Sequence, residues 1–173
     1  APANGLLKTL EEPGQATLVL LATDSANLLP TIISRCHTIP FRRLDPQTLA
    51  TVLTQTGHGD ILQQPDIVAL AQGSPGQAIA AWERLQALPA DLLSALQRPP
   101  SSLRQALDLA RRTSKELDTE SQLWLTEYLQ QVFWGNQRSP SILEALEDAR
   151  FQLRRYVQPR LVWEVTLMAL VGQ

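Results

Sequence analysis

Arg35 is the residue of this sequence best suited to act on a neighbouring molecule. It follows the apolar segment 28–34 and precedes Cys36, in the run Leu-Leu-Pro-Thr-Ile-Ile-Ser-Arg-Cys. We expect residues 28–34 to form a short helix anchored in a core, which would hold Arg35 on a rigid support at the edge of its domain. A guanidinium group held in this way can bind a phosphate through two parallel hydrogen bonds. From the residues alone, the favoured interpretation is the ordinary one, an arginine that the dipole of its helix stabilises.

Other side chains capable of chemistry do not combine into a catalytic group. Cys36 is expected to be buried and inert, because it follows an apolar helix and has no base beside it. A Cys36–His37 dyad is rejected, since consecutive residues of a strand point to opposite faces. The adjacent carboxylates at 11–12 and 147–148 diverge by roughly 100° on their helices. We therefore predict no hydrolase or transferase activity for the chain acting alone.

The composition indicates a globular protein with little capacity for metal chemistry. Of 173 residues, 44% are hydrophobic and 18% are charged, which is enough apolar chain to form a core. The formal net charge of −2 gives no argument for a strongly basic nucleic-acid binder. A single cysteine excludes an internal disulfide framework and a cysteine-rich zinc site. The apolar runs are far shorter than the roughly 20 residues of a membrane span, so we expect a soluble, intracellular fragment of a longer protein.

Residues 1–44 carry the strand signals of the sequence. A helix is predicted over 3–12, because a proline and a glycine follow it. The run 17–22 is apolar on both faces, which is typical of a central strand in a covered parallel sheet. A second short strand is predicted over 37–41, where a proline restricts it to a sheet edge. Most of such a sheet is missing, so we expect this region to be rearranged or paired with another copy.

The remainder of the chain is predicted to be helical. A capping residue followed by proline marks two helix starts, at 45–46 and 74–75. The predicted helices cover 45–56, 65–72, 76–87, 90–96, 102–114, 119–134, 141–157 and 159–171. A capping box is expected at Thr119 and Gln122. The spacing of Leu161, Val165 and Met168 predicts a buried stripe on the last helix.

The tryptophans and the arginine clusters of this part have ordinary explanations. The tryptophans at 82, 124, 134 and 163 lie at helical spacing among aliphatic residues, which favours core packing over stacking on bases. Trp134 is the best candidate for partial exposure at an interface. Basic clusters occur at 111, 112 and 115 and at 150, 154, 155 and 160. Because residues 90–173 contain ten basic and ten acidic side chains, solvated faces are favoured over direct DNA contact.

Three segments within residues 4–36 resemble the bacterial clamp-loader subunits of the AAA+ class, in the order and spacing of that family. Residues 4–13 (NGLLKTLEEP) are similar to the family's NALLKTLEEP helix, and residues 20–23 (LLAT) to its sensor 1 strand and turn. Residues 33–36 match the Ser-Arg-Cys motif that supplies the family's trans-acting arginine. A lone Ser-Arg-Cys is a weak signal, whereas the three segments together are specific.

Within this family, residues 73–78 (GSPGQA) are similar to the delta-prime type, the stator of the DNA polymerase III clamp loader. The ATP-hydrolysing motor subunits have an arginine where this sequence has Gly76, and that arginine senses the γ-phosphate. The resemblance therefore implies poor or absent ATP hydrolysis by the parent subunit. Thr23 is the candidate nucleotide-sensing residue, although Asp24 replaces the second threonine of the family's turn. No phosphate-binding loop motif occurs in the chain.

The resemblance implies a mainly helical fold in three parts. Residues 1–44 would be the C-terminal part of an AAA+ α/β nucleotide-binding domain, 45–88 a helical lid, and 89–173 a helical collar that packs with sister subunits. Arg35 would act as an arginine finger in the ATP site of a neighbouring motor subunit. The fragment itself would bind no cofactor and no metal, and ATP and Mg²⁺ would lie in the neighbouring subunit.

The implied partners are the motor (tau/gamma) subunits and the delta subunit, with the sliding clamp and primed DNA reached through the complex. The implied location is the cytoplasm, with no membrane contact. Two alternatives remain open. In one, the chain belongs to an ATP-hydrolysing motor subunit of the tau/gamma type, which a phosphate-binding loop upstream would favour. In the other, it is a plain helical adaptor in which Arg35 is structural.

Overall fold

The computed structural model describes residues 9–11, 14–136 and 139–172. They belong to two compact units, Ala1–Arg42 and Arg43–Gln173. Helices are the regular elements of both units, and none of the described residues is in a strand. The fold is therefore mainly helical, as the sequence predicts.

The first unit has little regular structure among its described residues. Residues 9–11 are helical, and most of the predicted helix over 3–12 lies outside the described residues. A 3-10 turn, η1 (Ser25–Asn27), precedes the four-residue helix α2 (Pro30–Ile33). Ile32 is buried, so α2 is anchored by an apolar side chain as expected.

The strands predicted over 17–22 and 37–41 are not formed. The side chains of Val19 and Leu21 in the first run are 77% and 93% exposed, and Phe41 in the second is 93% exposed. A strand requires hydrogen bonds to a neighbouring strand, and the described residues offer none. The composition of these runs is typical of strands, but the strand predictions are wrong for this chain.

The second unit begins with short helices whose starts are fixed by local signals. The carboxylate of Asp45 accepts two backbone N–H groups in the first turn of α3 (Pro46–Gln55). The hydroxyl of Ser74 accepts one at the start of α5 (Pro75–Ala87). Between them lie η2 (Gly59–Gln63), a 3-10 turn that the sequence analysis did not predict, and α4 (Pro65–Ala71). These helices confirm the starts predicted from the cap-proline pairs.

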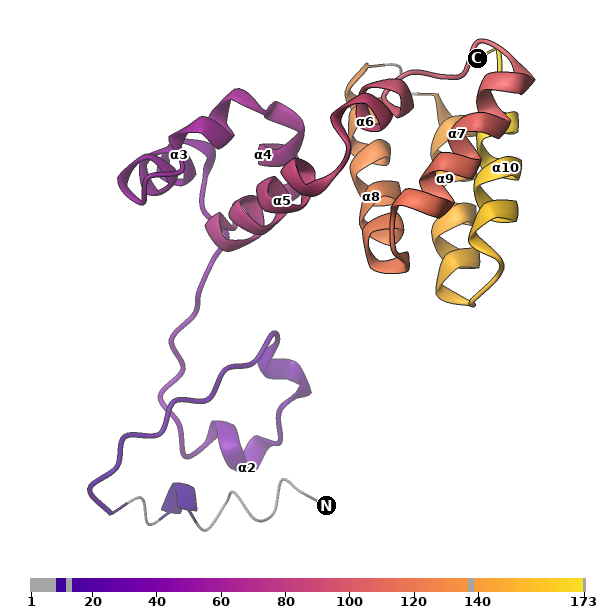
Figure 1. Cartoon of the computed structure of the whole chain (residues 1–173). Helices are drawn as coiled ribbons and strands as arrows, with labels where there is room; N and C mark the ends of the chain where they lie inside the picture. Colours follow the sequence, from indigo (N-terminus) through magenta and orange to yellow (C-terminus); the bar gives the residue numbers. More distant parts are fainter. Residues whose placement is uncertain (1–8, 12–13, 137–138, 173) are drawn as a thin grey trace. The chain divides into compact units, whose positions relative to one another are not determined.

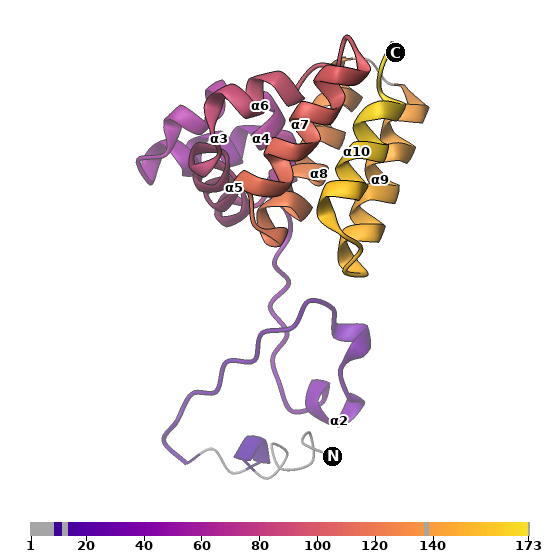
Figure 2. The same cartoon turned by 45° about the vertical axis from the view of Figure 1, so that its right-hand side comes forward.

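Further helices form the rest of the second unit. They are α6 (Ala90–Leu96), α7 (Leu103–Glu116), α8 (Thr119–Asn136), α9 (Pro140–Arg154) and α10 (Pro159–Ala169). Helix α7 packs along α10, α8 along α9, and α9 along α10 (Figures 1 and 2). Helix α4 packs on α8. No described helix is long and apolar enough to cross a lipid bilayer.

The start of α8 differs in its cap from the prediction. The carboxylate of Asp118, not the side chain of Thr119, accepts the backbone N–H of Ser121 at 2.8 Å. The side chain of Gln122 is buried and donates to the carbonyl oxygen of Leu117 at 2.8 Å. The predicted capping box at Thr119 and Gln122 is therefore wrong, because Gln122 turns into the core rather than back to the cap.

One hydrophobic core extends through the short and the long helices of the second unit. Its largest fully buried side chains are Trp163, Tyr128 and Phe133. The stripe predicted to be buried on α10 is wrong, since Leu161 and Val165 are 51% and 52% exposed and Met168 is also exposed. Helix α10 is apolar on two sides, and packing against α7 and α9 buries the side that carries Trp163.

The tryptophans follow the predicted pattern. Trp124 and Trp163 are buried, and the ring of Trp124 stacks on Tyr128 with 5.4 Å between centroids. Trp82 is half-buried and donates its indole N–H to Asp60 at 3.1 Å. Trp134 is 55% exposed, which confirms the expected partial exposure.

Candidate functional site

Arg35 lies just beyond the C-terminal end of α2. Leu29 has an extended backbone and Pro30 begins the helix. The backbone N–H of Ser34 donates to the carbonyl of Pro30, and that of Arg35 to the carbonyl of Ile32 at 3.1 Å. The expected short helix is confirmed, although it is shorter than 28–34. Arg35 therefore extends from a fixed support, with its side chain 37% exposed.

The guanidinium group of Arg35 is held by partners within its own unit. Its Nε donates to Oε1 of Glu11 at 2.9 Å, and its Nη2 lies 2.6 Å from the same oxygen. Its Nη1 donates to the carbonyl oxygen of Thr31 at 3.1 Å and to the hydroxyl of Ser34 at 3.3 Å. The Nε/Nη2 edge, which could chelate a phosphate, is thus occupied by a carboxylate. Sequence reasoning missed this contact, because Glu11 and Arg35 are far apart in the chain.

The other predicted site residues of the first unit do not join Arg35. Thr23 is exposed, and the hydrogen bonds of the Arg35 side chain within the described residues go to Glu11, Thr31 and Ser34. Cys36 is half-buried rather than buried, and His37 is exposed. The described residues contain no cluster of three or more His, Cys, Asp or Glu side chains that could hold a metal ion.

Two glycines at the turn into α5 have opposite surroundings. At Gly73, which has φ +83°, an added Cβ would overlap the backbone of Leu44, whose N–H donates to the Gly73 carbonyl at 3.0 Å. Arg43 donates to the backbone and the side chain of Gln72 beside it. At Gly76 an added Cβ would have no atom within 4 Å. A side chain is therefore excluded by the packing at Gly73, whereas at Gly76 there is room for one.

Three aspartates at helix starts of the second unit have lowered pKa values. Hydrogen bonds from the Thr48 side chain and backbone lower the pKa of Asp45, and those from Ser121 lower that of Asp118. Asp91 accepts from Arg112 at 2.7 Å, and this hydrogen bond lowers its pKa. All three carboxylates stabilise backbone or ion-pair contacts, so they are structural groups rather than acid–base catalysts.

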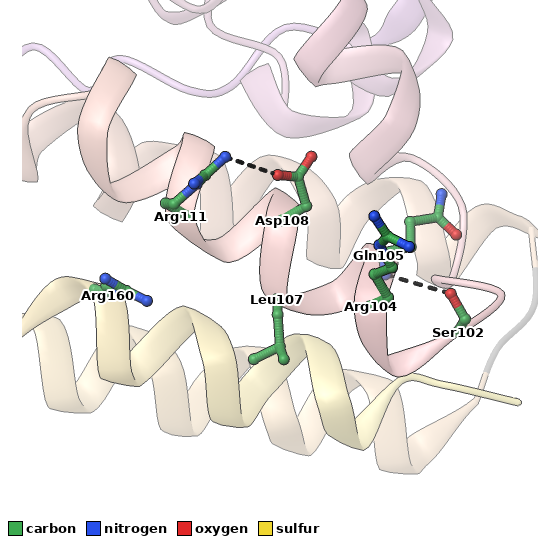
Figure 3. A pocket seen from close by; sticks show the side chains of 7 residues that line it. All are labelled: Ser102, Arg104, Gln105, Leu107, Asp108, Arg111 and Arg160. Carbon is green, nitrogen blue, oxygen red and sulfur yellow. Dashed lines mark hydrogen bonds and ion pairs between the residues drawn. The ribbon is translucent and has the colours of Figure 1, made fainter.

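The outer surface of the α7–α10 pair combines apolar and basic side chains. A hollow of about 620 Å³ is bordered by Leu107 and by Arg104, Arg111 and Arg160. In Figure 3 the side chain of Leu107 points toward α10, and Arg111 is paired with Asp108 at 3.2 Å. Leu103 on α7 is 58% exposed, and the exposed stripe on α10 adds further apolar surface. Sequence periodicity indicated this stripe but assigned it to the core.

Two family models match the chain. The family described as cyanobacterial DNA polymerase III delta prime, C-terminal domain, matches residues 47–170. The chain belongs to this family. A second family model, described as DNA polymerase III, delta subunit, matches residues 1–45. The delta-prime resemblance inferred from the motifs is therefore confirmed, and the two matches meet close to the boundary between the compact units.

The curated relatives include both delta' and gamma/tau subunits of DNA polymerase III. The chain is 52% identical over 48 residues to DNA polymerase III subunit delta' of Bacillus subtilis, which covers 27% of this chain and 15% of that protein. It is 38% identical over 87 residues to subunit delta' of Escherichia coli, covering 48% of this chain and 25% of that protein. It is also 34% identical over 94 residues to subunit gamma/tau of Mycobacterium tuberculosis, covering 51% of this chain and 16% of that protein.

These matches cover only part of the relatives. The matched segments amount to between 15% and 25% of the lengths of these three proteins. No solved structure matches the chain. Membership in the delta-prime family places the chain among the subunits of DNA polymerase III.

Proposed function

We propose that this chain belongs to the stator of the DNA polymerase III clamp loader and that Arg35 serves as its arginine finger. The observation that carries the proposal is the position of Arg35, on a fixed and partly exposed support at the end of α2, in a chain of the delta-prime family. In this role the guanidinium stabilises charge on the phosphoryl group that a neighbouring motor (tau/gamma) subunit transfers. ATP and Mg²⁺ belong to that neighbour.

In this proposal the Arg35 side chain exchanges its contact with Glu11 for a contact with a phosphate group. In the isolated chain, Glu11 occupies the Nε/Nη2 edge of Arg35. A phosphate oxygen pair offers the same bidentate geometry with more negative charge. Arg35 therefore leaves Glu11 when a neighbouring subunit presents a nucleotide, and it returns when the nucleotide departs.

The remaining parts of the chain act as support in this proposal. Residues 1–44 form the end of an AAA+ nucleotide-binding domain, 45–88 a lid, and 89–173 a collar. Gly76 offers no side chain to a phosphate, which supports a subunit without ATP hydrolysis of its own. The exposed apolar side chains of α7 and α10 give the collar a surface for sister subunits, including delta. Through the complex, the subunit acts on the sliding clamp and primed DNA in the cytoplasm.

The test measures ATP hydrolysis by a complex assembled from the full-length subunit, the motor subunits and delta. Arg35→Ala is expected to lower single-turnover hydrolysis at one site of the ring, where arginine fingers contribute about 10³–10⁵ in rate. Arg42→Ala is the matched control, because it removes an exposed arginine from the same unit. Unchanged hydrolysis in a complex that still assembles with Arg35→Ala would overturn the finger assignment.

Two other functions are separated by the same experiment. The similarity to a gamma/tau subunit favours an active motor as the second candidate, and hydrolysis by the full-length subunit alone would support it. The ion pair with Glu11 supports the third candidate, an adaptor in which Arg35 is structural. In that case the complex with Arg35→Ala still assembles, and hydrolysis by its partners is unchanged.

A further inference from the structure

We infer that the turn between α9 and α10 is a binding site for single-stranded nucleic acid. The site consists of Phe151, Arg154, Arg155 and Tyr156, which we call the aromatic–arginine patch. All four side chains are exposed. This inference does not depend on Arg35 and goes beyond the proposed function.

Tyr156 occupies a backbone position that normally takes glycine. Its φ is +59°, in the left-handed region that L-residues adopt only with backbone strain. The backbone N–H of Tyr156 donates to the carbonyl of Leu153 at 3.2 Å, and that of Val157 to the carbonyl of Gln152 at 3.2 Å. This hydrogen-bond pair is the Schellman ending of a helix, in which glycine or asparagine is favoured after the cap. A tyrosine therefore stands where a smaller residue would fold with less strain.

Nothing within the described structure offsets this strain through the side chain of Tyr156. The residue is 93% exposed, so its ring contributes almost no burial. A strained residue that does not stabilise its own fold is a reason to look for a ligand. The ring is free on its faces, as a stacking platform for a base requires.

A second aromatic ring, that of Phe151, lies five residues before Tyr156, near the end of α9. Phe151 is 53% exposed, and the guanidinium carbon of Arg155 lies 4.0 Å from the centroid of its ring. This cation–π contact keeps a positive charge beside an exposed aromatic face. The patch thus presents two aromatic rings with an arginine between them in sequence and in contact with one of them.

The charges of the patch favour a polyanion. No acidic residue occurs between positions 149 and 163, a stretch with four arginines. Arg150 lies near Glu127 and Glu147, and Arg160 binds Glu164 at 2.8 Å. In the described part of the chain, Arg154 and Arg155 have no ion-pair partner. Two cations therefore remain available to phosphate groups.

The combination of aromatic rings and arginines favours single strands over other ligands. Proteins that bind single strands combine aromatic stacking with a cationic track for the backbone. The bases of a duplex are already stacked on each other and cannot reach the rings. The positive charge of Arg154 and Arg155, which no acidic side chain of the described residues offsets, favours a polyanionic strand over a protein segment. The exposed rings favour a single strand over a duplex.

The test uses fluorescence anisotropy of a labelled oligo-dT, about 20 nucleotides long to exceed common site sizes, with the full chain. Tyr156→Gly is the decisive variant, because glycine suits the left-handed position and the fold is retained or improved. We expect it to weaken binding about tenfold, as the loss of one stacked base does. Tyr156→Phe should bind as the parent does. Arg154→Ala with Arg155→Ala should reduce the dependence of binding on salt.

Phe41→Gly provides a matched control, since Phe41 is also 93% exposed but lies outside the patch. The proposal is overturned if the parent does not bind at about 100 µM, the weak limit of non-specific binding, or if Tyr156→Gly binds as well as the parent. Equal binding of a duplex of the same length also overturns it, since charge alone would then explain the affinity. If Tyr156→Gly instead blocks assembly with tau and delta while oligo-dT binding is unchanged, the patch is a protein interface.

Discussion

Arg35 and Glu11, 24 residues apart in the sequence, form a close ion pair in which one carboxylate oxygen contacts both Nε and Nη2 of the guanidinium. Both side chains are more than a third exposed. Exposed pairs of this kind add little to stability. The contact therefore holds Arg35 in place weakly enough for a more strongly charged anion to displace Glu11.

Removing the charge of Glu11 should make Arg35 more available. If Arg35 is the arginine finger, Glu11→Gln raises hydrolysis by the assembled complex at subsaturating ATP by up to about fivefold, the range that exposed ion pairs permit. The effect should vanish in the Arg35→Ala background. A fall in rate with Glu11→Gln would show instead that Glu11 orients the finger for the reaction.

The glycines at 73 and 76 should respond in opposite directions to the same substitution. Gly73→Ala is expected to destabilise the second unit by more than about 1 kcal/mol, because its positive φ and the Leu44 backbone exclude a Cβ. Gly76→Ala should stabilise it by up to about 1 kcal/mol, because alanine favours the helix. Urea unfolding of both variants measures the difference. Equal stability of the two variants would contradict the described packing at Gly73.

The indole N–H of Trp163 forms a buried hydrogen bond within the core. It donates to Oε1 of Gln122 at 2.9 Å, and both side chains are buried. Trp163→Phe should cost about 1–3 kcal/mol for the unpaired amide, in addition to the lost packing. A double-mutant cycle with Gln122→Met isolates the hydrogen bond, and an absence of coupling would show that only packing is lost.

The apolar surface of α10 should matter for assembly more than for folding. Val165→Lys is expected to change the free energy of unfolding by less than about 0.5 kcal/mol, because the residue is exposed. It should also weaken the mixed complex with tau and delta, measured by size exclusion with light scattering. Glu144→Lys, which places a lysine at an exposed position on α9, is the control. If Val165→Lys assembles normally, this surface is not part of the collar interface.

The second unit should lose stability in acid through its helix caps. The pKa values of Asp45 and Asp118 lie below the ordinary value of 3.8 in the folded chain. Their contribution is therefore complete above that value and is lost as the pH falls through the lowered pKa. Asp45→Asn with Asp118→Asn keeps a capping side chain but cannot titrate, so its stability should fall less between neutral and acid pH. If the stability of the variant and of the parent fall equally in acid, other carboxylates cause the loss.

The sequence predicts most helices of the second unit because their signals are local. A cap followed by proline places the starts of α3 and α5, and these need no distant partner. The side of α10 that is buried could not be predicted, because Leu161 and Trp163 lie on different apolar faces and only packing against α7 and α9 selects one. The strand prediction for residues 17–22 is wrong for a related reason, since a strand exists only when another chain segment pairs with it.

The candidate site shows the same division between local and distant information. The position of Arg35 at the end of a short helix follows from residues close to it in the sequence. Its pairing with Glu11 does not, because the two segments meet only through tertiary structure. The left-handed backbone of Tyr156 also has no local signal, since glycine or asparagine is the residue that would have indicated it.

Two tryptophans of the chain lie in different environments, so their fluorescence can report on different parts of the protein. Trp163 is fully buried with its indole hydrogen-bonded, whereas Trp134 is more than half exposed. The emission of Trp163 should lie at short wavelength and resist quenching by acrylamide, and that of Trp134 should be red-shifted and easily quenched. Loss of the core and coverage of the surface by a partner would therefore change different parts of the same emission spectrum, without any added label.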